Sequence, residues 1–221
     1  MKRRSGRVND EASLARAVRL LASRDADLAS VVTRYGAPPL WSRAPGFATL
    51  VHVVLEQQVS LASARAAFER LTSVASPLTP ASLLSLDDAT LKSVGFSRQK
   101  AAYTRGLATE ILSGRLDLDR LDQLDDDAAR RELTRLKGIG RWTADIYLLM
   151  ALGRPDIWPS GDLALAVAFQ RLKNSAVRPT PLALEAAGEA WRPLRAVAAR
   201  ILWHYYLCER AALRSRPKLR R

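Results

Sequence analysis

The sequence predicts an all-α protein. Apolar residues recur at the three- and four-residue spacing of one helix face through most of the 221 residues. No run of alternating apolar and polar residues indicates a strand, and prolines and glycines separate the helical segments at short intervals. The length is sufficient for one large domain or for two small lobes that share a core.

The first half of the chain contains amphipathic segments with turns between them. A loop with three prolines is expected over 36–46, and the polar patch Glu56-Gln57-Gln58 interrupts an otherwise apolar helix. The expected helices cover 11–28, 47–71, 80–84, 87–94 and 97–112.

In the second half of the chain, three consecutive acidic residues mark the beginning of the first expected helix. Asp125 is placed as an N-cap, and Asp126 and Asp127 interact favourably with the helix dipole. This helix is expected to end near Leu136. Further helices are expected over 141–152, 163–172 and 193–212.

The charge favours a polyanionic partner. The formal net charge is +13, which suits a nucleic acid. Much of the excess positive charge lies in the tails, and an arginine-rich composition can also reflect genomic base composition. Charge alone therefore does not distinguish a nucleic-acid-binding protein from one whose basic surface has no specific role. The tail cations are Lys2, Arg3, Arg4 and Arg7, and Arg214, Arg216, Lys218, Arg220 and Arg221.

The composition disfavours several other classes of protein. The sequence has one cysteine, Cys208, and two histidines, His52 and His204, which are too few ligands for a zinc or iron–sulfur site built within this chain. No apolar run approaches the roughly 18 residues of a membrane span, and no apolar segment follows the basic N-terminus as in a secretory signal. We therefore expect a cytoplasmic, nucleoid-associated protein without a membrane partner.

The stretch LKGIGRW, Leu136 to Trp142, lies between two expected helices and forms a helix–hairpin–helix. Glycines at positions 138 and 140 permit φ > 0 and a close approach to the backbone. The next helix then presents free N–H groups that attract an anion such as a DNA phosphate, and Lys137 and Arg141 add positive charge. On spacing alone, an ordinary helix–helix turn explains the glycines equally well.

Four stretches together resemble the helix–hairpin–helix (HhH-GPD) DNA glycosylases. They occur in the family's order and cover roughly Phe47 to Leu207. The resemblance is to the 3-methyladenine DNA glycosylase II (AlkA) type, in a short form without the extra N-terminal domain. The stretches are Leu55-Glu-Gln-Gln-Val-Ser60, the hairpin Leu136–Ala144, Pro159-Ser-Gly-Asp162-Leu, and Trp191-Arg-Pro-Leu-Arg195.

The resemblance implies two helical lobes with the active site in the cleft between them. One lobe covers about 50–155, and the other covers 10–49 with 156–210, leaving basic tails at 1–9 and 211–221. The implied partner is double-stranded DNA that contains alkylated bases, bound by a monomer.

The resemblance also implies roles for single residues. Asp162 is the expected catalytic carboxylate, and its alternative role as an N-cap of the helix beginning at Leu163 is compatible with catalysis. Gln58 matches the family's wedge, which fills the gap left by a flipped nucleotide; a plain helix-surface amide is the alternative. The other expected DNA contacts are Gln57, Lys137, Gly138, Ile139, Gly140, Arg141, Thr143 and Arg195.

Trp142 indicates which chemistry the family member performs. It occupies the position at which strand-cutting members carry a nucleophilic lysine, and an indole cannot form the required Schiff base. The resemblance therefore implies a monofunctional enzyme that hydrolyses the N-glycosidic bond and has no lyase activity.

The expected substrate pocket is less aromatic than that of the family. Three positions that hold aromatic residues in relatives hold aliphatic ones here, which predicts a roomier pocket. The expected lining residues are Trp142, Ile146, Leu163, Leu194 and Trp158.

Two other functions stay open at this stage. A non-catalytic helix–hairpin–helix module explains the glycines but gives no reason for Asp162 or Trp142, and a glycosylase for oxidised or mismatched bases conflicts with Trp142. The family also suggests a sodium or potassium ion at the backbone carbonyls of Leu136 and Ile139, with no other cofactor. Glu56 stands where many relatives have glycine, and the sequence offers no reason for it.

Overall fold

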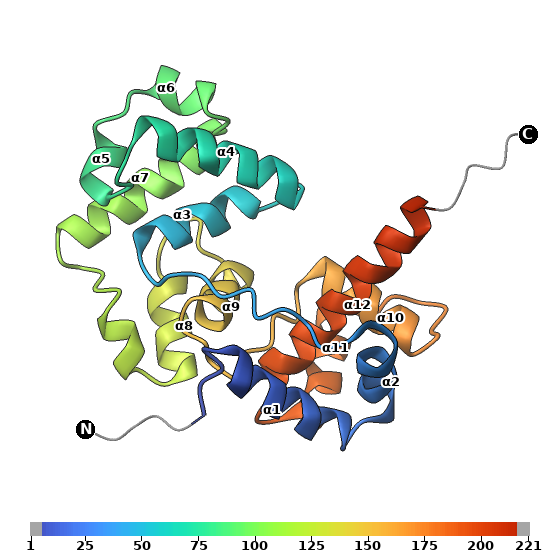
Figure 1. The fold of residues 1–221 in the computed structure, drawn as a ribbon. Helices are drawn as coiled ribbons and strands as arrows, with labels where there is room; N and C mark the ends of the chain where they lie inside the picture. The colour runs from blue at the N-terminus through green and yellow to red at the C-terminus, as the bar shows by residue number, and fades with distance from the viewer. Residues whose placement is uncertain (1–5, 216–221) are drawn as a thin grey trace, which may run out of the picture. The chain divides into compact units, whose positions relative to one another are not determined.

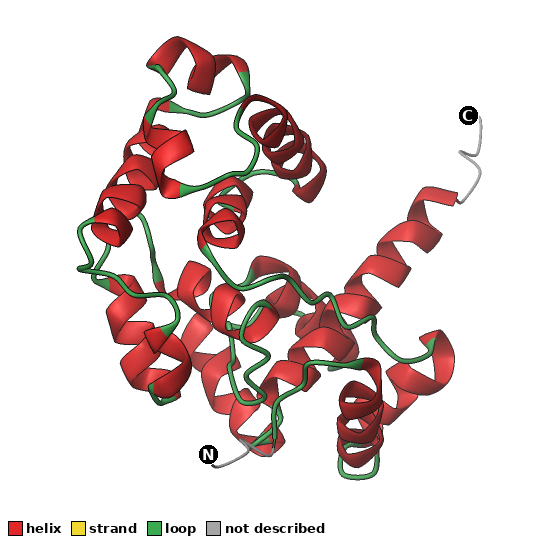
Figure 2. Cartoon of the chain, turned by 60° about the vertical axis from the view of Figure 1, so that its left-hand side comes forward, coloured by secondary structure: helices red, strands yellow, loops and turns green. Residues whose placement is uncertain are grey.

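The computed structural model describes residues 6–215, and every regular element within that range is a helix (Figures 1 and 2). The predicted all-α class is confirmed. No helix in this range is both long and apolar enough to cross a membrane. Of the basic tail residues, Lys2, Arg3, Arg4, Arg216, Lys218, Arg220 and Arg221 lie outside the described residues.

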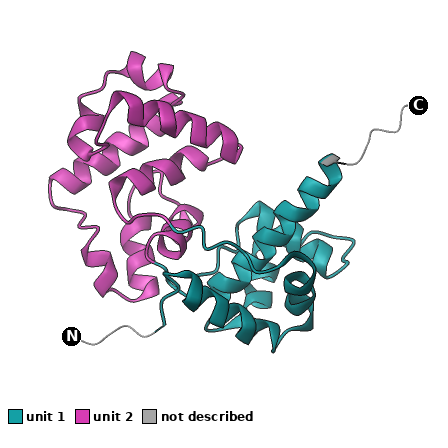
Figure 3. Cartoon of the chain, in the orientation of Figure 1, with its two compact units in different colours: residues 1–42, 153–221 teal, residues 43–152 magenta. Residues whose placement is uncertain are grey.

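The chain divides into two compact units (Figure 3). Unit 2 is the continuous segment Arg43–Leu152, whereas unit 1 combines Met1–Ser42 with Gly153–Arg221. The helices of unit 2 are α3 (Phe47–Glu56), α4 (Leu61–Val74), α5 (Pro80–Leu84), α6 (Asp88–Ser93), α7 (Arg98–Leu112), the 3-10 helix η1 (Arg120–Gln123), α8 (Asp126–Thr134) and α9 (Arg141–Met150). Those of unit 1 are α1 (Glu11–Ala22), α2 (Ala26–Tyr35), α10 (Leu163–Leu172), α11 (Pro181–Gly188), the 3-10 helix η2 (Glu189–Trp191) and α12 (Arg195–Ser215).

Helix α12 is the central helix of unit 1 and packs against α1, α2 and α10. Its first turns carry the small residues Ala196, Ala198 and Ala199, all of them fully buried. Small side chains let neighbouring helices approach closely, and Ile201 and Leu202 fill the next turn of the core.

The N-terminal helix is shorter than predicted. In place of one helix over 11–28, α1 ends at Ala22 and α2 begins at Ala26. The Asp25 side chain accepts a hydrogen bond from the Leu28 N–H at 2.9 Å and so caps α2, and it also accepts one from the Trp191 indole at 2.8 Å. Local capping therefore prevails over the apolar periodicity that continues across the break.

Three elements were not anticipated: α11, η1 and η2. The signal for α11 was present, because Thr180 precedes a proline at the first helical position and caps the Ala183 N–H at 3.2 Å. Helix α12 begins at Arg195, two residues later than predicted.

The polar patch in unit 2 ends α3 rather than merely interrupting it. Gln57 has an extended backbone, and Gln58 has a left-handed φ of 58° that non-glycine residues rarely adopt. The Ser60 hydroxyl then caps α4 by accepting from the Ser63 N–H at 3.1 Å. The result is a tight turn with exposed residues at its tip.

Candidate functional site

The hairpin between α8 and α9 is closed by one main-chain bond, from the Ile139 N–H to the Leu136 carbonyl at 3.0 Å. Gly138 has a φ of +90°, and a Cβ added there would lie 2.1 Å from Cγ of Tyr103. Both the backbone conformation and the packing against Tyr103 therefore require glycine at 138.

Gly140 serves a different purpose in the same hairpin. Its φ is −81°, and a Cβ added there would meet no atom within 4 Å. Gly140 is also the N-cap of α9, where no side chain caps the helix. The start of α9 thus presents main-chain N–H groups beside a bare backbone, which is the arrangement that binds anions.

Two cations flank this helix start. Lys137 and Arg141 are both exposed. Arg141 forms an ion pair with Asp145. The fully buried Asp145 carboxylate lies 3.5 Å from Arg141 Nε and 2.7 Å from Arg130 Nε. The ion pair with the buried Asp145 carboxylate fixes the Arg141 side chain beside the hairpin, while the Arg141 guanidinium stays accessible to solvent.

Gln57 joins the hairpin to the turn that follows α3. Its side-chain amide donates to the Gly138 carbonyl and to the Thr143 hydroxyl, both at 2.9 Å. The sequence predicts that the Gln57 and Thr143 side chains contact DNA. In the structure they instead form hydrogen bonds within the protein that stabilise the hairpin. The Thr143 and Ile139 side chains are buried, so only their main chain remains for DNA. Gln58 is exposed at the tip of the turn, as a wedge residue must be.

Asp162 caps α10, as its position in the sequence suggested. Its Oδ1 accepts from the Leu165 N–H at 2.8 Å. The same oxygen accepts from the indole N–H of Trp203 at 3.0 Å. Two donors on one oxygen fix the orientation of the carboxylate. Sequence reasoning missed Trp203, because it lies 41 residues away on α12 and no local pattern links the two.

The expected pocket residues fall into two groups. Leu163, the residue after Asp162, is 62% exposed, and Trp142 and Leu194 are half-buried, so all three present surface that a ligand can contact. Trp158, in contrast, is 1% exposed, its indole donates to the Leu184 carbonyl at 2.8 Å, and its ring packs edge-on against Trp191. We therefore assign Trp158 to the core of unit 1. Ile146 is also buried.

Arg195 is occupied within unit 1 and is not a surface cation. Its guanidinium donates to both carboxylate oxygens of Asp156 at 3.0 Å and to Glu189 at 3.1 Å. The role in DNA contact expected from the sequence does not fit this geometry. The network instead ties the start of α12 to the segment that leads to Asp162.

Glu56, for which the sequence offered no reason, forms a buried ion pair in unit 2. It accepts two hydrogen bonds from the Arg43 guanidinium, at 2.6 and 3.1 Å, and so anchors the loop before α3. His52 lies 3.8 Å from the same carboxylate and stacks on Phe68; burial lowers its pKa. These contacts make His52 a packed residue.

Lys100 caps the C-terminal end of α3. Its ammonium donates to the Leu55 carbonyl at 2.6 Å, and burial lowers its pKa. Cys208 is half-buried beside His204. Within residues 6–215, no group of three or more histidine, cysteine, aspartate or glutamate side chains is arranged to hold a metal ion.

A two-glycine hairpin that leads into an uncapped helix start, built into an all-helical fold, defines the class of helix–hairpin–helix proteins. Within that class, residues 51–193 match the HhH-GPD superfamily of base excision DNA repair proteins, and the chain belongs to this family.

Curated relatives and solved structures agree with this assignment. DNA-3-methyladenine glycosylase 1 of Schizosaccharomyces pombe is 29% identical over 158 residues, which cover 70% of this chain and 69% of that protein. The chain spans less than half of several other curated relatives.

Two solved structures share the fold along most of both chains. The structure of Schizosaccharomyces pombe 3-methyladenine DNA glycosylase in complex with abasic DNA is 27% identical, with a TM-score of 0.80 over 85% of this chain and 95% of that one. A DNA-3-methyladenine glycosidase from Bacillus halodurans is 26% identical, with a TM-score of 0.72 over 92% and 94%.

Proposed function

We propose that this protein is a monofunctional DNA glycosylase that removes alkylated bases from duplex DNA by hydrolysis and leaves an abasic site. The observation that carries the proposal is the Asp162 carboxylate, fixed by the Leu165 N–H and the Trp203 indole, in a chain of the HhH-GPD family. A helix–hairpin–helix module that only binds DNA has no use for such a carboxylate.

The reaction breaks the bond between a base and C1′ of its deoxyribose. That bond is shielded inside the duplex, so the nucleotide must first be flipped out of the stack. The hairpin binds the backbone through the N–H groups of α9, and the exposed Gln58 fills the gap in the stack. Neither contact reads base sequence, as suits a repair enzyme that acts at lesions in any context.

Bond breaking develops positive charge on the sugar, and a fixed carboxylate stabilises that charge without reorganising. Asp162 supplies the negative charge and can also orient the attacking water. Its two hydrogen bonds hold it in place before the substrate arrives, so no free energy is needed to orient it during the reaction.

Trp203→Phe tests the positioning of this carboxylate. Phenylalanine keeps an aromatic ring but removes the N–H donor, so we expect the single-turnover rate of base release to fall about tenfold, the effect of losing one hydrogen bond to a charged group. Trp191→Phe is the matched control, because it removes an indole bond to the capping carboxylate of Asp25 instead. Equal single-turnover rates in the two variants would contradict a positioning role for Trp203.

Alkylated bases suit this site for an electrostatic reason. Alkylation at N3 of adenine or N7 of guanine leaves a cationic base, which already weakens the glycosidic bond and is attracted to an electron-rich indole such as that of Trp142. The aliphatic Leu163 and Leu194 leave the pocket roomier, so we expect 3-methyladenine, 7-methylguanine and ethenoadenine all to be released. Release of one small lesion alone would contradict the roomier pocket.

One assay tests the proposed function and its alternatives. Protein is incubated with alkylated duplex DNA, and free base, abasic sites and strand breaks are measured with and without alkali. We expect free base and abasic sites, with strand breaks only after alkali. Borohydride should trap no covalent adduct, because Trp142 provides no amine. Binding without base release would favour a DNA-binding module, and strand cutting before alkali would favour a bifunctional enzyme for oxidised bases.

Three further features belong to the proposal. The protein acts as a monomer in the cytoplasm, at the nucleoid.

A sodium or potassium ion binds the hairpin carbonyls, and hard carbonyl oxygens suit such an ion. The Leu136 carbonyl accepts only the Ile139 N–H among the main-chain bonds of the hairpin, and a carbonyl oxygen has two lone pairs. DNA affinity should therefore fall when potassium is replaced by a large organic cation at equal ionic strength.

A further inference from the structure

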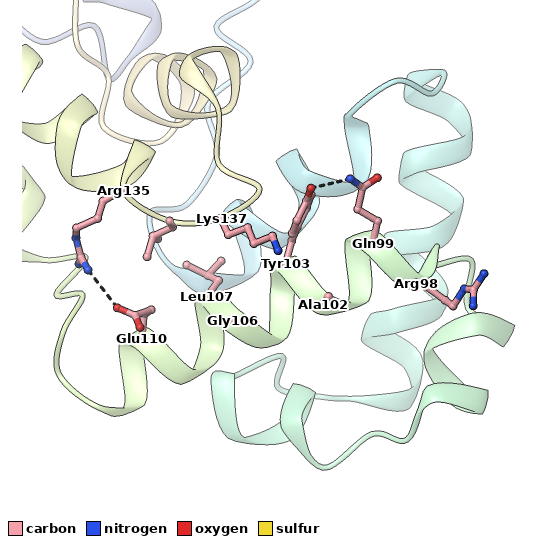
Figure 4. Close-up of a pocket in the computed structure, with 10 residues that line it drawn as sticks. Arg98, Gln99, Ala102, Tyr103, Gly106, Leu107, Glu110, Arg135 and Lys137 are labelled. Carbon is pink, nitrogen blue, oxygen red and sulfur yellow. Dashed lines mark hydrogen bonds and ion pairs between the residues drawn. The ribbon is translucent and has the colours of Figure 1, made fainter.

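An open groove of about 600 Å³ lies in unit 2 between α7 and the hairpin (Figure 4). It adjoins the hairpin, because Leu136 and Lys137 belong to both the hairpin and the groove. No role in the proposed reaction accounts for it. Its lining residues are Arg98, Gln99, Ala102, Tyr103, Gly106, Leu107, Glu110, Arg135, Leu136 and Lys137.

The groove is lined by exposed cations that no carboxylate compensates. Arg98 lies at the N-terminal end of α7 and Lys137 lies beside Tyr103 (Figure 4), and neither has a carboxylate partner within residues 6–215. The carboxylate at the other end, Glu110, is paired with Arg115 at 2.7 Å and Arg135 at 3.3 Å. The groove therefore presents uncompensated cations to an anionic ligand.

The floor of the groove is open because α7 carries small residues there. Arg98, Ala102, Gly106 and Glu110 follow one another at four-residue spacing on one face of the helix. Gly106 is a poor helix former in the middle of a 15-residue helix, yet a Cβ added there would meet no atom within 4 Å. Packing within the protein gives no reason for glycine at this position, whereas a ligand that approaches the main chain does.

The groove and the hairpin are held together as one surface. The Tyr103 ring packs against Gly138, where an added Cβ would lie 2.1 Å from Tyr103 Cγ. The Gln99 amide donates to the Tyr103 hydroxyl at 2.7 Å (Figure 4). Tyr103 therefore links the groove-lining face of α7 to the hairpin.

We propose that this groove binds the phosphodiester backbone of the same duplex that the hairpin holds, with Arg98 and Lys137 as its phosphate contacts. The inference rests on the proposed function, since it extends the DNA contact of that site. Phosphate contacts position a protein on the duplex without reading sequence, so the groove adds affinity and register but no base preference.

The test compares two groove variants with two matched controls. Arg98→Ala removes a rim cation, and Arg120→Ala removes an exposed cation of unit 2 that does not line the groove. Gly106→Glu places a negative side chain in the groove, and Thr109→Glu adds the same charge to an exposed position of α7 outside it. Thermal unfolding checks that all four fold, and Gly106→Glu should not lose stability because glutamate favours helix.

Binding is measured on an unmodified duplex and on one with an abasic-site analogue, by fluorescence anisotropy over a range of salt concentrations. Each groove variant should raise Kd about tenfold near 0.1 M salt, and Arg98→Ala should flatten the slope of log Kd against log salt by about 0.9, the effect of one lost phosphate contact. Values for the groove variants that match those of their controls would overturn the proposal.

Base release by the unmodified protein is measured in parallel, so that the two proposals fail separately. If base is released and the groove variants match their controls, only the groove proposal is overturned. If no base is released but the groove variants still bind more weakly, the groove stands as a DNA contact and the glycosylase proposal fails. If the unmodified protein binds neither duplex, both are overturned.

Discussion

Asp162→Asn should abolish detectable base release from alkylated DNA while the protein stays folded and binds DNA. Asparagine is nearly isosteric, and its side-chain oxygen can still accept from the Leu165 N–H and the Trp203 indole. The variant therefore keeps the acceptor that caps α10 and that Trp203 orients, while the negative charge is lost. Removal of one preorganised electrostatic group costs about 10²–10³-fold in rate, and the loss of a full charge beside a developing cation should cost at least as much.

The measurement is single-turnover release of 3-methyladenine with enzyme in excess over DNA. Affinity for a duplex with an abasic-site analogue, measured on the same preparation, should change little, because the hairpin proposed to bind the backbone lies elsewhere in the sequence. Undiminished excision by this variant would remove Asp162 from the mechanism. Loss of DNA binding together with excision would show that its role is structural.

Gly138→Ala should destabilise the protein and abolish tight DNA binding, whereas Gly140→Ala should affect only DNA binding. At position 138 the added methyl group would lie 2.1 Å from Tyr103 Cγ, on a backbone with φ of +90°. Overpacking and backbone strain together should lower the free energy of unfolding by about 2–4 kcal/mol. At position 140 the added methyl group meets no atom of the protein within 4 Å, and φ is already negative.

Denaturant unfolding of the two variants checks this division. Gly140→Ala should unfold within about 0.5 kcal/mol of the unmodified protein. Its Kd for duplex DNA should nevertheless rise, because the methyl group stands where we propose that a phosphate approaches the start of α9. Equal losses of stability in both variants would contradict separate roles for the two glycines, and unchanged affinity in Gly140→Ala would contradict close approach of the backbone.

Several features of the site were predictable because they depend on neighbouring residues. The hairpin follows from two glycines between helical segments, and the N-cap role of Asp162 follows from an acidic residue placed just before an apolar helix, whereas its catalytic role is implied by the family resemblance. Capping and turn formation act over three or four residues, so the sequence displays them directly. The break between α1 and α2 is also local: Asp25 caps α2, although the apolar periodicity continues across the break and predicts a single helix.

Other features required the fold, because their partners are distant in the chain. Gln57 reaches the Gly138 carbonyl across 81 residues, and an amide in a polar patch gives no sign of whether it faces solvent or another segment. Arg195 is similar: an arginine at a helix start in a basic protein suggests DNA, but the carboxylate of Asp156, 39 residues away, holds it inside unit 1.

Local patterns in the chain predict the helical class and the hairpin, and Trp142, read through the family resemblance, excludes a lysine nucleophile at that position. Each of these depends on local periodicity, on glycine conformation or on the chemistry of one side chain. The folded chain was needed to show that Trp203 orients the Asp162 carboxylate, that Gly138 packs on Tyr103, and that a groove with exposed cations adjoins the hairpin. These depend on which helix faces which, and that arrangement is set by burial of the whole apolar surface and not by any short stretch of residues.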